Sequence, residues 1–130
     1  MENRSGNRDS SGPRPTTFDR FQSLGRLRAV YNTGCGLKNE RIENIPAGMF
    51  AITGGTICDI HVHGDDEDPR ATFTLVGETG DRAIIAVSTD AYFDAFGDIV
   101  DGHVVEVRGT IVRPFRDGPA HVQLLSLYTA

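Results

Sequence analysis

Between residues 47 and 129 the chain carries five short segments with the pattern of β-strands, and one helical segment lies between the third and the fourth. The strand segments cover residues 47–62, 71–77, 82–88, 103–114 and 120–129. The helical segment, residues 89–100, places four apolar side chains on one face at helical spacing: Tyr92, Phe96, Ile99 and Val100. Ser88 or Thr89 can cap its start, and Gly102 lies where a C-terminal cap belongs. The sequence therefore predicts an all-β fold with little helix.

Glycines indicate how these strands are shaped. Gly54 and Gly55 interrupt the first segment, where they predict a bulge or a sharp bend, and Gly109 predicts a second bend in the fourth. A small barrel needs such a bend where one strand serves both sides of the closed sheet. Residues 78–81 form a predicted hairpin turn. Three strands, a helix and two strands match the five-stranded Greek-key barrel of the OB-fold, which we place over residues 46–130.

The residues before this barrel divide into two parts. Residues 1–17 hold only one large apolar side chain and predict a disordered tail. Residues 18–45 form a predicted helix with a linker, because five apolar side chains recur at three-residue spacing, namely Phe18, Phe21, Leu24, Leu27 and Val30. This helix, within residues 17–31, either packs its apolar face on the barrel, which we favour, or binds a partner.

Charge is unevenly distributed along the chain. The formal net charge is −5, but residues 1–44 hold eight Lys or Arg and five acids, whereas residues 45–130 hold five Arg and thirteen acids. Phosphate affinity comes mostly from Lys and Arg, so a nucleic-acid surface on the acidic barrel must be local. No apolar stretch approaches the roughly 20 residues that cross a bilayer. We expect a cytoplasmic protein with no membrane contact, in which Cys35 and Cys58 are free thiols.

The candidate binding residues lie on the second and third strands and on the last hairpin. If Ala71, Phe73 and Leu75 face the core, alternation turns Thr72 and Thr74 outward. The candidates for nucleic-acid contact are Arg70, Thr72, Thr74, Arg82, Arg113, Phe115 and Arg116. The Arg-Pro-Phe-Arg run of the hairpin combines phosphate contact with base stacking. The alternative is a solvated hairpin whose aromatic side chain folds back on the barrel.

Several of these motifs occur together in a known family. Glu78-Thr79-Gly80, the alternating residues 83–87, Tyr92, Asp101-Gly102 and the run from Val105 to Ile111 follow one another in that order. This pattern resembles the OB domain of bacterial DNA polymerase III alpha subunits, which is of the tRNA-anticodon type. The resemblance covers roughly residues 50–130, and it implies single-stranded nucleic-acid binding or a structural role in a replication assembly.

One loop departs from that family. The loop after the first strand, commonly basic in the family, is here Asp65-Asp66-Glu67-Asp68, which would repel phosphate. Either the loop swings clear of the nucleic acid, or it serves a protein or metal partner, or nucleic-acid binding has been lost. The alternative function is therefore an assembly module that contacts a protein through loop 65–68 or the N-terminal helix.

The sequence gives little support for metal binding or catalysis. Cys58, His61 and His63 are possible zinc ligands, but on a regular strand Cys58 points away from the two histidines. No phosphate-binding glycine loop or catalytic triad is evident. We expect no metal site, no cofactor and no enzymatic activity, and single-stranded DNA or RNA is the expected partner.

Overall fold

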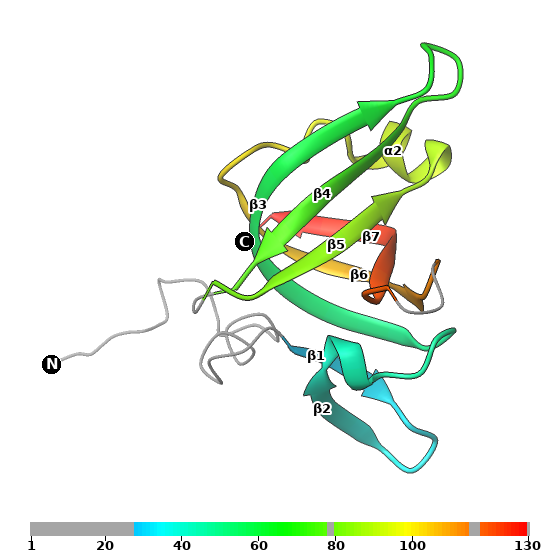
Figure 1. Cartoon of the computed structure of the whole chain (residues 1–130), viewed down its shortest axis with the longest axis vertical. Coiled ribbons are helices and arrows are strands. Elements are labelled where there is room, and N and C mark those ends of the chain that lie inside the picture. Colours follow the sequence, from blue (N-terminus) through cyan, green and yellow to red (C-terminus); the bar gives the residue numbers. More distant parts are fainter. Residues whose placement is uncertain (1–27, 78–79, 115–117, 130) are drawn as a thin grey trace, which may run out of the picture.

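The computed structural model describes residues 28–77, 80–114 and 118–129, and most of these residues lie in strands (Figure 1). In chain order the elements are β1 (Arg28–Asn32), β2 (Leu37–Arg41), the 3₁₀ helix η1 (Ile42–Asn44), β3 (Phe50–His63), β4 (Arg70–Val76), β5 (Arg82–Val87), the helix α2 (Thr89–Ala95), β6 (Val104–Val112) and β7 (His121–Thr129). All five strands predicted within residues 47–129 are present, and their ends differ from the predicted ones by at most three residues.

Five strands close into a barrel in the order β3, β4, β5, β7, β6 and back to β3. The β5–β7 pairing is parallel, and the other pairings of the barrel are antiparallel. The long strand β3 makes closure possible, because residues 50–56 pair with β6 and residues 56–63 pair with β4. The predicted sharing of one strand between both sides of the sheet is thereby confirmed. This closed barrel is compatible with an OB-like fold.

The switch between the two partners of β3 occurs beside Gly55. A Cβ atom on Gly55 would lie 2.7 Å from the carbonyl oxygen of Val76, at the end of β4. Only glycine lets the two backbones approach this closely. The glycine pair was therefore a correct sequence signal for the place where β3 leaves β6 and joins β4.

The barrel interior is filled by inward-facing side chains, which alternate most regularly with outward-facing ones in β4, β5 and β6. In β4, Ala71, Phe73 and Leu75 are buried, whereas Thr72 and Thr74 are only partly covered. The same alternation continues in β5 and in β6 up to Ile111. The predicted orientation of β4 is therefore confirmed, and its threonines lie on the outer surface of the barrel.

The chain before the barrel differs from the prediction. Residues 28–32 form strand β1, so the predicted helix is wrong for residues 28–31, and residues 18–27 lie outside the described part of the chain. β1 forms a hairpin with β2 and pairs with β3 through Val30–Ile52 and Tyr31–Ala51. The buried Thr53 hydroxyl donates a 2.5 Å hydrogen bond to the Arg28 carbonyl. Residues 28–32 form a strand because an edge of β3 is available for pairing. This pairing outweighs the helical spacing of the apolar side chains.

The helix between β5 and β6 is shorter than predicted. The Ser88 hydroxyl accepts a hydrogen bond from the Ala91 amide, which confirms the predicted cap, but α2 ends at Ala95. Gly102 therefore does not cap it and instead forms the turn into β6, with a φ of 86°. α2 buries Ala91 and Ala95, whereas Phe96 and Val100, two of the four side chains that the sequence placed on one apolar face, are exposed. Among the described residues, no helix has the length and hydropathy required to cross a membrane.

Candidate nucleic-acid interface

The outer face of β3, β4 and β5 carries Cys58 as well as His61 and His63, whereas regular alternation along β3 predicted Cys58 on the opposite face. Cys58 lies opposite Thr74, His61 opposite Thr72, and His63 opposite Arg70. Residues directly opposite each other in a sheet share a face. Cys58 therefore lies on the same outer face as the two histidines, and the prediction that it points away from them is wrong.

A β-bulge in β3 causes this difference. The register shifts between Cys58 and His61, so that Asp59 and Ile60 together face one residue of β4. Asp59 has a φ of 51°, a left-handed conformation that Asp tolerates better than most residues. The extra residue reverses the alternation beyond it. Within residues 28–77, 80–114 and 118–129, no three His, Cys, Asp or Glu side chains are close enough together to hold a metal ion.

A groove of about 600 Å³ lies on this outer face, at the end of the barrel where β4 begins and β5 ends. Arg70 and Thr72 of β4 line it, as do His63 of β3 and the β7 side chains His121 and Gln123. Sequence reasoning found the first two and missed the other three. β7 reaches the groove through its parallel pairing with β5, in which Ala86 lies opposite Gln123, and no local pattern reveals such a pairing.

His121 of β7 is a titratable side chain in the groove. Partial burial holds the pKa of its imidazole below the usual value of 6.5, because desolvation disfavours the charged form. The side chain is therefore neutral at pH 7. It can act there as a hydrogen-bond donor or acceptor for a ligand rather than as a cation.

This lowered pKa predicts a loss of stability in acid. Below pH 6.5 the unfolded chain binds a proton at His121 more readily than the folded protein does, so the free energy of unfolding falls as the pH drops through 6.5 to the folded pKa. Urea unfolding at pH 7.5 and pH 5.0 should show a smaller loss for His121→Gln than for the wild type. Equal losses in the two proteins would contradict this assignment.

Arg82 lies at the opposite end of β5 from the groove. Its guanidinium forms a 3.2 Å ion pair with Asp59, the bulge residue, and also approaches the Cys58 sulfur at 3.8 Å. Both charged side chains are exposed, and exposed pairs contribute at most about 1 kcal/mol. Arg82 can therefore leave Asp59 for a phosphate. Thr74 lies between the two ends of the face, opposite Ile84.

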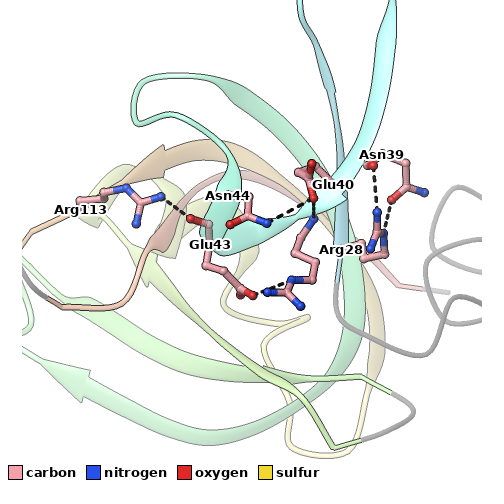
Figure 2. A network of polar contacts seen from close by, with 7 residues as sticks. Arg28, Asn39, Glu40, Glu43, Asn44 and Arg113 are labelled. Carbon is pink, nitrogen blue, oxygen red and sulfur yellow. Dashed lines mark hydrogen bonds and ion pairs between the residues drawn. The ribbon is translucent and has the colours of Figure 1, made fainter.

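Arg113 has a structural contact that the sequence did not reveal. Figure 2 shows its guanidinium reaching η1, where one terminal nitrogen donates to the Glu43 carbonyl at 2.7 Å. The same nitrogen also donates to the carbonyl of Ile45, the residue after η1, at 3.2 Å. This contact ties the end of β6 to the segment that follows β2. Phe115 and Arg116 lie outside the described residues, so the role of the Arg113–Arg116 run in binding stays a prediction.

The acidic loop is folded toward α2. The Asp65 carboxylate accepts hydrogen bonds from the amides of Glu67 and Asp68, and the Thr89 hydroxyl at the start of α2 donates to the Asp68 carboxylate. These contacts fix the loop beside the helix. His63, at the end of β3 just before the loop, lines the groove.

No protein-family model matches the chain, and no curated protein matches it. The resemblance to the polymerase OB domain consequently remains a similarity of turn glycines and core positions. Function must be argued from the outer face itself, since one barrel architecture serves many functions.

Proposed function

We propose that the protein is a non-enzymatic module that binds single-stranded DNA or RNA on the outer face of β3, β4, β5 and β7. The observation that carries this proposal is the chemistry of the groove. It is lined by Arg70, two histidines and the polar side chains of Thr72, Ser88 and Gln123, and no carboxylate is among its described lining residues. The barrel region as a whole is strongly acidic, so a groove without carboxylates is where a phosphate meets the least repulsion.

The groove also contains groups that can stack on a nucleobase and form hydrogen bonds with it. Imidazole rings provide flat surfaces for stacking, and the hydroxyl and amide groups donate and accept hydrogen bonds. With one arginine in the groove and Arg82 at the far end of the face, few phosphates can be neutralised. We therefore propose weak, salt-sensitive binding with little sequence preference. From the resemblance to the polymerase domain, we also propose that the protein is accessory to DNA replication or repair.

Replacing Arg70 by alanine should weaken oligonucleotide binding. Removing one phosphate contact lowers the affinity several-fold at low salt and reduces the slope of log K against log salt by about 0.7. Fluorescence anisotropy of the full chain with a labelled single-stranded oligonucleotide, at 20 mM and 200 mM salt, measures both effects. Trials with DNA and with RNA decide which of the two is preferred.

Arg108→Ala is the matched control. Arg108 lies on β6 with its guanidinium 5.0 Å from the centre of the Tyr128 ring, and it is absent from the groove. Its loss should leave the affinity unchanged within about 1.5-fold, since Arg108 lies outside the groove and its charge is already paired with Glu106 at 2.9 Å. If Arg108→Ala weakens binding as much as Arg70→Ala, the groove is not the site. If the wild type binds no oligonucleotide at low salt, the assembly-module alternative replaces this proposal.

A further inference from the structure

A second groove, of about 310 Å³, lies between the end of β3, the acidic loop and α2. Its apolar lining comes from Val62, Pro69 and three aromatic side chains on α2 and at its C-terminal cap, Tyr92, Phe93 and Phe96. Phe93 of α2 and Phe96, the residue that caps the C-terminus of α2, are 53% and 60% exposed, although the helix packs on the barrel. Tyr92 lies between them, with ring centres 6.4 Å from Phe93 and 6.0 Å from Phe96. Exposed aromatic clusters of this kind mark docking surfaces.

The rim of this groove is acidic. Asp65 and Asp66 line it, and Asp90 and Asp94 are exposed on α2. The sequence contains no Lys or Arg between residues 83 and 107 or between residues 59 and 69. This aromatic groove therefore repels phosphate and favours a basic segment that carries large apolar side chains.

We propose that the beginning of segment 18–27 of the same chain, with Phe18 as its anchor, occupies this groove. The segment FDRFQSLGRL holds four large apolar side chains, Phe18, Phe21, Leu24 and Leu27. Residues 14–27 contain three arginines and a single acid, Asp19. Apolar anchors flanked by arginines complement an aromatic groove rimmed by aspartates. Their packing would cover the part of α2 that the barrel leaves exposed.

The start of β1 makes this docking geometrically possible. β1 runs antiparallel to β3, so the chain before Arg28 leaves in the direction in which β3 runs toward Val62. By the same register Arg28 lies near Gly54, and the eight residues from there to Val62 span about 26 Å at about 3.3 Å per residue. Ten extended residues, 18–27, reach about 33 Å. Phe18, ten residues before Arg28, can therefore reach the groove without a second copy of the chain, whereas Phe21, seven residues before Arg28, reaches only about 23 Å.

Docking would also change the neighbouring groove. Because His63 lines both grooves, a docked segment would bring its arginines beside the proposed nucleic-acid site and cover the acidic loop. The docking itself does not depend on nucleic-acid binding, and its test uses no oligonucleotide.

Limited trypsin digestion of the full chain tests the proposal. Docking protects the bond after Arg20, close to the Phe18 anchor, so Phe96→Asp should speed its cleavage at least about fivefold, because proteolysis follows the population of the undocked state. Leu125→Asp is the matched control: Leu125 on β7 is 58% exposed, lines neither groove and gains the same charge. Equal rates in all three proteins, or an equal rise in Leu125→Asp, would overturn the proposal.

A second experiment tests the contact directly. In the full chain with Phe18→Ala and Phe21→Ala the groove loses its own anchors, so a fluorescein-labelled peptide of residues 14–27 should bind and raise the anisotropy. Adding Phe96→Asp to that chain should abolish the binding. Protection from trypsin that disappears on dilution would show that a second copy supplies the segment, and it would overturn docking within one chain.

Discussion

Replacing Gly109 by alanine is expected to lower the free energy of unfolding by about 3 kcal/mol, at the upper end of the usual cost of overpacking. A Cβ atom at this position would lie 2.2 Å from the Gln123 carbonyl oxygen and 2.8 Å from a methyl group of Val122. β7 cannot move away easily, because it pairs with β6 on one side and with β5 on the other. The register of β6 and β7 also shifts beside Gly109, so the added Cβ atom would overlap with β7 at a point where the pairing is already irregular.

Gly97→Ala provides the control for this prediction. Nothing lies within 4 Å of a Cβ atom built on Gly97, and its φ is outside the left-handed region. Its replacement should change the free energy of unfolding by less than about 1 kcal/mol, through the unfolded chain alone. Urea unfolding of the two variants and the wild type measures the difference. Equal stability of Gly109→Ala and Gly97→Ala would contradict the close approach of β6 and β7.

Phe73→Ala is expected to cost about 4 kcal/mol of unfolding free energy, in the range for removal of a buried aromatic ring. Phe73 is 1% exposed, and it is the largest of the fully buried side chains. It lies at the centre of β4, opposite Ile85 of β5, and on its other side it faces the bulge formed by Asp59 and Ile60. The cavity would lie directly beneath the outer face that carries Thr72 and Thr74.

Phe50→Ala is the control for Phe73→Ala, because it removes an aromatic ring from an exposed position. Phe50 is 48% exposed at the start of β3, so the same truncation should cost less than about 1.5 kcal/mol. Thermal unfolding followed by circular dichroism compares the two variants. A similar fall of the melting temperature in both would show that Phe73 does not hold the centre of the core.

The barrel was predictable from the sequence because its signals are local. Alternation in β4 identified the buried Ala71, Phe73 and Leu75, and it did so because a strand turns successive side chains to opposite faces. Gly55 and Gly109 marked two places where backbones come too close for a Cβ atom. Ser88 marked the start of α2, since a hydroxyl at that position satisfies a free amide.

The site was less predictable because its residues meet through pairing. Arg70 and Thr72 were identified from β4 alone, whereas His121 and Gln123 enter the groove only through the parallel pairing of β7 with β5. Arg113 read as a free cation in the sequence, yet in the structure it donates to the carbonyls of Glu43 and Ile45, some 70 residues earlier in the chain.

The sequence by itself determined the number of the barrel strands, their succession along the chain, the buried face of β4 and two positions, Gly55 and Gly109, where backbones approach closely. These depend on side-chain alternation and on steric limits within a few residues. Only the tertiary structure decided that residues 28–32 form a strand, that a bulge places Cys58 beside His61, and that Phe96 stays exposed. The physical reason is that each of these depends on which neighbouring strand or surface is available, and contacts between distant residues leave no local pattern.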